Sequence, residues 1–192
     1  MYRHFFKRLI DIVLSFIGIV VLALPMLVFA FIIKAEDPGP VFFRQKRIGI
    51  HKTQFSLLKF RSMKMSTPHD MPTHMLENPE QYILRCGRWM RKMSIDELPQ
   101  LFNILKGDIS IVGPRPIVEK ETQIYGDDVE KLLSVKPGLT GYWQAYARNN
   151  ATYESGERQK MEMYYVEHNS LWLDIKILFK TVISVIKKEG AQ

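Results

Sequence analysis

The chain has 192 residues, 46% of them hydrophobic, and a formal net charge of +7. This length supports one ordinary domain with a proper core and argues against two full domains. The basic excess indicates an anionic partner such as phosphate, nucleic acid or a lipid surface, without choosing among them. The single cysteine, Cys86, excludes an internal disulfide and favours a reducing compartment.

The first element is an apolar run, residues 12–33, which contains 22 residues without a charge. At about 1.5 Å per residue it would reach across a hydrocarbon core of roughly 30 Å, so it belongs in lipid. Pro25 lies near its middle and predicts a bend, because proline removes a helical hydrogen bond. Asp11, just before the run, is expected to pair with Lys7 four residues earlier.

The charges around this run predict how it meets the membrane. The basic residues nearest its two ends are Arg3, Lys7, Arg8 and Lys34. Because basic flanks mark the cytoplasmic side, a helix that enters the membrane and returns on the same side satisfies both ends. A kinked helix that spans the membrane satisfies one end only, and it remains the alternative.

Two strands are predicted next, at residues 41–49 and 54–61, joined by a turn. Side chains alternate between the two faces of a strand, so Lys59 and Arg61 share a face. These basic residues are either solvated or line an anion site.

The stretch over residues 94–103 carries the strongest chemical signal in the chain. Asp96 and Glu97 are adjacent carboxylates, and Pro99 fits the first position of a helix that ends at Gly107. The carboxylates would lie just outside the positive N-terminal end of that helix, where anions and their metal counterions are favoured. The stretch therefore predicts a site for a metal and a phosphate.

Basic residues surround this stretch on both sides. A helix predicted over residues 81–93 places Arg91 nearest to the carboxylates. Arg115 follows them and is held between Pro114 and Pro116, whose stiff backbone suits a guanidinium that meets a phosphate in a set geometry. A rigid turn with an incidental arginine is the alternative for Arg115.

A purely structural interpretation of the carboxylates is also open. Ser94 would then be a helix N-cap, and Glu97 would reach back to it as in a capping box. Pro99 would become the fifth helical residue and would delete a hydrogen bond, which weighs against this interpretation.

Three further elements complete the chain. Residues 119–135 predict a charged helix, and the glycine-rich residues 136–144 either cradle a base and phosphates or simply pack. Residues 171–188 predict an amphipathic helix. Its basic face and opposite aromatic residues are typical of an interfacial helix, and helices that cover a core share the pattern.

Together these motifs resemble the bacterial sugar transferases, and in particular the small monotopic phosphoglycosyl transferases that start membrane glycan assembly. The residues that carry the resemblance are Lys7-Arg8 with Asp11, Pro38-Gly39-Pro40, Gln45 to Gly49, Lys59-Phe60-Arg61, Asp96 to Gln100, Gly113 to Pro116, Pro137 to Gly141 and Arg148-Asn149. They run over nearly the whole chain. Without further apolar runs before residue 12, the sequence looks like the minimal form of the family.

The resemblance implies an activity and its partners. A sugar phosphate would pass from a UDP-sugar to a polyprenyl phosphate, usually undecaprenyl phosphate, with release of UMP and a requirement for Mg²⁺. Asp96 would be the nucleophile that forms an aspartyl phosphosugar intermediate, and Glu97 would bind the metal together with Asp96. The candidate phosphate contacts are Lys59, Arg61, Arg91, Arg115 and Arg148.

The resemblance also implies a fold and a location. The expected fold is α+β and mainly helical, with residues 1–36 as a re-entrant membrane helix. Residues 37–192 would form a cytoplasmic catalytic domain with a small β-hairpin and interfacial amphipathic helices, integrated with the membrane helix. The enzyme would work on the cytoplasmic face of the bacterial inner membrane, with lipid but no nucleic acid as a partner, and a homodimer is left open.

Two positions depart from the family pattern. The family breaks its re-entrant helix at a Ser-Pro pair, whereas this chain has Leu24-Pro25, which keeps the membrane kink at Pro25 without the hydroxyl. Glu162 stands where the family usually has Asp.

A different class of protein is compatible with the residues alone. A membrane-anchored basic module could bind nucleic acid or anionic lipid and use the carboxylates as helix caps. Such a module needs no Asp96-Glu97 pair, and turnover of a UDP-sugar separates the two classes.

Overall fold

The computed structural model describes residues 2–67, 78–147 and 151–186. Helices predominate, and the chain also forms two small two-stranded sheets, in agreement with the α+β class expected from the sequence. The α-helices are α1 (Lys7–Glu36), α2 (Arg85–Lys92), α3 (Gln100–Lys106), α4 (Thr122–Tyr125), α5 (Val129–Leu132), α6 (Tyr142–Tyr146), α7 (Glu157–His168) and α8 (Leu171–Ile186). The strands are β1 (Phe42–Ile48), β2 (Gln54–Phe60), β3 (Ser110–Val112) and β4 (Gly138–Thr140).

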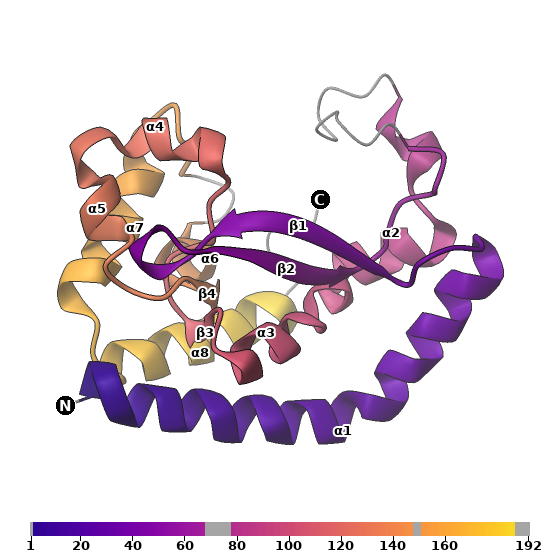
Figure 1. Ribbon diagram of the computed structural model, residues 1–192, viewed down its shortest axis with the longest axis horizontal. Helices are drawn as coiled ribbons and strands as arrows, with labels where there is room; N and C mark the ends of the chain where they lie inside the picture. The colour runs from indigo at the N-terminus through magenta and orange to yellow at the C-terminus, as the bar shows by residue number, and fades with distance from the viewer. Residues whose placement is uncertain (1, 68–77, 148–150, 187–192) are drawn as a thin grey trace.

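Helix α1 is the longest element and carries Pro25 inside it. Figure 1 shows α1 running along the base of the molecule and bending upward in its second part. A bend of this kind is what a proline inside a helix produces. Within the described ranges, α1 is the one helix that is long and apolar enough to cross a membrane. Its outer side exposes large apolar residues, with Leu24 72% and Phe31 75% exposed.

The inner side of α1 packs against the rest of the chain. Met26 and Ile33 are buried in a cluster with Phe60 of β2 and with Leu84 and Met90 at α2. The apolar helix and the predicted catalytic segments therefore share one part of the core.

The start of α1 is held by partners that the sequence analysis did not predict. Asp11 was expected to pair with Lys7, but its Oδ1 accepts hydrogen bonds from Ser110 Oγ at 3.0 Å and from the Ile111 N–H at 2.9 Å. Lys7 instead forms an ion pair with Asp174 of α8. The expected pairing was wrong because buried partners from distant elements replaced the neighbour four residues away.

Strands β1 and β2 form the predicted hairpin. They pair antiparallel from Phe42 opposite Phe60 to Ile48 opposite Gln54, within one residue of the predicted bounds. The turn contains two residues with positive φ, His51 and Lys52.

The glycine-rich residues 136–144 pair with a neighbouring strand. Strand β4 lies parallel to β3, and a Cβ atom on Gly138 would lie 2.1 Å from the Gly113 nitrogen. Only glycine fits so close an approach of two backbones. The glycines of this stretch thus have a packing role, one of the two roles predicted for them.

Two predicted helices are shorter than expected. The helix predicted over residues 81–93 is α2 alone, preceded by a 3₁₀ turn over Pro79–Tyr82. The helix predicted over residues 119–135 is broken into α4 and α5 with 3₁₀ turns, because Gly126 adopts φ 50° and ψ −124°, which no continuous helix permits.

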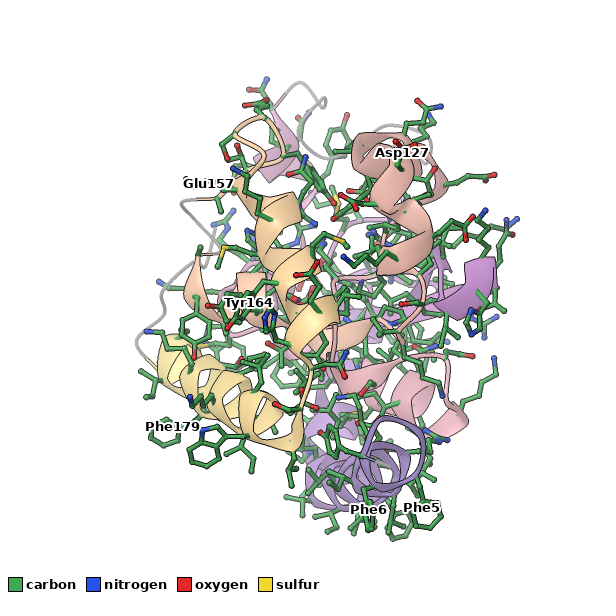
Figure 2. All side chains as sticks on the ribbon, turned by 90° about the vertical axis from the view of Figure 1, so that its left-hand side faces the viewer. Phe5, Phe6, Asp127, Glu157, Tyr164 and Phe179 are labelled. Carbon is green, nitrogen blue, oxygen red and sulfur yellow. The ribbon has the colours of Figure 1, made fainter. Side chains whose placement is uncertain are left out.

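Helix α8 is amphipathic, as predicted. Asp174 and Ile177 are buried, whereas Trp172 is 65% and Phe179 is 69% exposed. Figure 2 shows Phe179 pointing away from the body at the same lower end of the molecule as Phe5, beside α1. The exposed side of α8 is therefore apolar and aromatic and lies near the apolar surface of α1.

Candidate active site

The two adjacent carboxylates lie on a short 3₁₀ helix, Ile95–Glu97, directly before α3. Ser94 precedes them with φ 55°, so the chain turns sharply where α2 ends. Pro99 is the cap residue of α3, and Gly107 ends α3 with φ 101°. The predicted helix bounds are thus confirmed to within one residue. The Ser94 side chain makes no capping hydrogen bond here, which removes the capping-box interpretation.

Lys59 of β2 reaches the second carboxylate. Its Nζ lies 2.7 Å from Glu97 Oε1, and both side chains remain about one quarter exposed, at 22% and 25%. The hairpin therefore places a cation directly against Glu97.

The protonation of Asp96 is altered by its surroundings. Burial and, after it, the nearby Glu97 charge raise the pKa of Asp96 to about 6, although the charges of Lys59 and Arg91 oppose the shift. A carboxylate with such a pKa is still largely ionised at neutral pH, and it is more basic than an ordinary aspartate.

Arg91 is positioned by a tight packing contact between α2 and the chain that follows β2. A Cβ atom on Gly87 would lie 2.2 Å from the Ser62 carbonyl oxygen, so α2 sits directly on this segment. The Arg91 Nε donates to Ser62 Oγ at 3.0 Å. The charge of Arg91, held in this way, lowers the pKa of Asp96.

Arg61 has a different partner from the other predicted phosphate contacts. It is buried, and its Nη1 lies 2.6 Å from Asp37 Oδ2, just after the end of α1. The structure therefore places Arg61 in the joint between the apolar helix and the hairpin.

Arg115 lies in a second group of charges. Its backbone N–H donates to both oxygens of Glu162, at 3.3 and 3.2 Å, and the charges of Arg115 and Arg158 act on that carboxylate. Arg148, the remaining predicted phosphate contact, lies outside the described residues.

Comparison with known proteins assigns the chain to a family. A family model described as bacterial sugar transferase matches residues 2–188. The chain belongs to the bacterial sugar transferase family. The resemblance inferred from the sequence motifs is confirmed.

The relatives of this sugar transferase include proteins named as undecaprenyl-phosphate sugar phosphotransferases. The chain is similar to the undecaprenyl-phosphate galactose phosphotransferase of Salmonella typhimurium, 41% identical over 98% of this chain and 42% of that protein. It is also similar to the UDP-N-acetylgalactosamine-undecaprenyl-phosphate N-acetylgalactosaminephosphotransferase of Aeromonas hydrophila, 37% identical over 98% of this chain and 45% of that protein. An uncharacterized sugar transferase of Bacillus subtilis, EpsL, is 38% identical over 97% of this chain and 90% of its own length. The chain thus spans less than half the length of the first two relatives.

The carboxylate pair of this sugar transferase fits a magnesium ion. Among the described residues, no three His, Cys, Asp or Glu side chains gather as a complete metal site. Mg²⁺ is commonly held by one or two carboxylates, with water and substrate phosphates as its other ligands. Burial and the Glu97 charge both raise the pKa of Asp96, and a bound cation would favour its ionised form.

Sequence reasoning missed two buried cations of the second charge group. Arg47 donates to the Pro116 carbonyl oxygen at 2.8 Å, beside the Arg115 turn. The Arg158 guanidinium stacks between Trp143 and Tyr153, 3.9 and 3.8 Å from the ring centroids. Arg47 belongs to a motif that the sequence analysis noted, whereas Arg158 gave no local signal, because its aromatic partners come from separate segments.

Proposed function

We propose that this sugar transferase moves a sugar 1-phosphate from a UDP-sugar to a polyprenyl phosphate such as undecaprenyl phosphate, with release of UMP. The observation that carries this proposal is the Asp96–Glu97 pair, which lies between Lys59 and Arg91 and against the apolar helix α1. The names of the relatives support the substrate class. The reaction would be the first membrane step in the assembly of a glycan.

The chemistry assigns a separate role to each carboxylate. Ionised Asp96 attacks the phosphorus that bears the sugar, the bond from this phosphorus to the bridging oxygen breaks, and UMP leaves with that oxygen. An oxygen of the lipid phosphate then attacks the same phosphorus and displaces the Asp96 carboxylate. This division into two half-reactions is covalent catalysis by a carboxylate.

Two anions must meet in the first half-reaction, and cations must screen them. Glu97 and Asp96 would hold Mg²⁺, which when bound neutralises charge on the phosphate oxygens. Lys59 and Arg91 supply fixed positive charge beside Asp96. Arg115 remains a predicted phosphate contact, and the hydrogen bond from its backbone N–H to Glu162 fixes the turn that carries it. Arg61 is assigned a structural role, because its ion pair with Asp37 links the hairpin to the end of α1. Arg148 remains a predicted phosphate contact.

The same geometry supports a proposal for the location of the enzyme. Ile95 and Leu98, the neighbours of the carboxylate pair, pack against the cluster that contains Met26 and Ile33 of α1. A lipid phosphate at the membrane surface can therefore reach the site if α1 lies in the bilayer. We propose that α1 enters and leaves the cytoplasmic leaflet of the inner membrane on one side, with its bend at Pro25 in the lipid. The aromatic side of α8 would then rest at the interface.

The deciding experiment omits the acceptor. Purified protein is mixed with Mg²⁺ and each of a panel of UDP-sugars, quenched within milliseconds and examined for UMP and for adduct mass. We expect up to one UMP per active site and a sugar phosphate on the peptide that contains Asp96. Asp96→Asn should give neither signal, whereas Asp127→Asn, the same change at an exposed position, should give both. UMP that appears only with polyprenyl phosphate present, and without adduct, would favour direct attack by the lipid phosphate.

A further inference from the structure

Phe43 of β1 lies opposite Lys59, the residue that binds Glu97 of the carboxylate pair, although no step of the proposed chemistry uses it. Phe43 is directly opposite Lys59 in the antiparallel pair. Side chains of directly opposed residues lie on the same face of the sheet, with their Cβ atoms about 4.5–5.5 Å apart. Because Lys59 Nζ contacts Glu97 at 2.7 Å, the phenyl ring lies on the face that borders the active site.

The ring is exposed there, unlike most large apolar residues of the hairpin. Phe43 is 48% exposed, whereas Phe55, Leu57 and Phe60 of β2 are buried. Its neighbour Phe42 points to the opposite face of the strand and stacks on Phe60, with ring centroids 5.5 Å apart. Phe42 is itself 42% exposed, but it lies on the face opposite to that of Lys59, whereas the exposed Phe43 ring shares the face of Lys59.

Phe43 also lies at the end of the hairpin that follows the apolar helix. It is seven residues after Glu36, where α1 ends. The carboxylate pair is flanked by Ile95 and Leu98, which pack against the cluster of α1 residues. If the phosphate of the acceptor reaches Asp96 from the side of α1, the hydrocarbon attached to that phosphate lies near this end of the hairpin.

We propose that Phe43 contacts the first isoprene units of the polyprenyl phosphate acceptor and so contributes to acceptor specificity. This inference rests on the proposed function. A phenyl ring offers no hydrogen bond to the charged groups around it, and its favourable ligand is apolar surface. Of the two substrates, the acceptor is the one whose phosphate is attached directly to hydrocarbon, whereas the donor phosphate carries sugar on one side and nucleoside on the other.

The test separates the two half-reactions. In detergent with Mg²⁺, Phe43→Ala should raise the KM for polyprenyl phosphate about tenfold, as loss of an apolar contact of this size predicts. The UMP burst without acceptor, and the KM for the UDP-sugar, should stay within about twofold of wild type. Phe43→Leu should recover most of the acceptor KM, because it restores apolar surface without an aromatic ring.

Two controls make the inference falsifiable. Phe42→Ala, next to it on the opposite face, should leave the acceptor KM within about twofold of wild type, and an equal rise in both variants would overturn a specific contact. The tenfold difference should persist with an acceptor of three or four isoprene units, because the proposed contact is with the first units. Loss of the difference with that short acceptor would overturn the inference.

Two other outcomes also decide against the inference. A Phe43→Ala variant with a weakened UMP burst or a raised UDP-sugar KM would show that the ring contacts the donor. If the wild-type protein releases no UMP under any condition, the proposed function is overturned, and the role of Phe43 with it. This outcome is seen with the wild-type protein alone and needs no variant.

Discussion

Glu162 is a buried carboxyl group whose protonation is altered by folding. Its side chain is 1% exposed, and burial raises the pKa of Glu162 to about 7, against the opposing effects of Arg158 and Arg115. In this carboxyl group, the cost of removing a charge from water exceeds the attraction of two guanidinium groups. The group still accepts both hydrogen bonds from the Arg115 N–H.

This pKa makes the stability of the fold depend on pH. A carboxyl group whose folded pKa lies above its unfolded value near 4.5 favours the folded state at low pH, and the contribution is lost as pH rises through about 7. Glu162→Gln keeps an acceptor for the Arg115 N–H and does not ionise. We expect the variant to match wild type near pH 5 and to exceed it at pH 8 by about 3 kcal/mol at most, which is about 6–12 °C in Tm.

The measurement is the melting temperature in detergent at several pH values from 5 to 8. Asp127→Asn changes an exposed carboxylate, and its melting temperature should depend on pH in the same way as that of wild type. Equal pH dependence of wild type and Glu162→Gln would contradict a buried, titrating Glu162.

At the scale of elements, α1 raises the question of topology. It exposes apolar side chains along its outer side and carries Pro25 inside it, and Lys7 and Lys34 lie near its two ends. Basic residues favour the cytoplasmic side of a membrane, so a bent helix with basic residues at both ends is expected to have both ends on that side. We therefore predict that the ends are on one side of the membrane.

Single cysteines test this topology in a Cys86→Ser background. Tyr2→Cys and Ala35→Cys should both resist a membrane-impermeant thiol reagent in intact cells, and both should react after the cells are permeabilised. Reaction of Tyr2→Cys alone in intact cells would instead indicate a helix that spans the membrane.

For the molecule as a whole, the two ends of the described chain are tied together by a buried ion pair. Lys7 at the start of α1 bonds Asp174 of α8, and the Tyr165 hydroxyl of α7 donates to Asp174 Oδ1 at 2.8 Å. Tyr2 also donates to Asp174. This network holds α1 and α8 side by side, so that their exposed apolar sides lie at the same end of the molecule (Figure 2).

Removing one partner of the Lys7–Asp174 ion pair should lower the free energy of unfolding. Asp174→Leu leaves the Lys7 ammonium buried without its partner, and such a loss typically lowers the free energy of unfolding by about 3–5 kcal/mol. The double variant Lys7→Met with Asp174→Leu should recover most of this loss, because it removes both charges. Thermal unfolding in detergent measures the difference, and additive losses in the double variant would show that the two charges are not coupled.

The sequence alone determined the elements and the chemistry of this protein where the signals are local. The uncharged run of α1, the alternation of the hairpin and the sequence around Pro99 and Gly107 each depend on residues close together in the chain. The carboxylate pair of Asp96 and Glu97 was found for the same reason, and so was the family.

Only the tertiary structure decided which charges meet. It placed Lys59 and Arg91 beside the carboxylates, Arg61 with Asp37, and Arg115 with Glu162. Asp11 and Lys7 took distant partners in place of each other. Ion pairs depend on distance in space and on burial, and neither is encoded by spacing along the chain once strands and helices from remote segments have packed together.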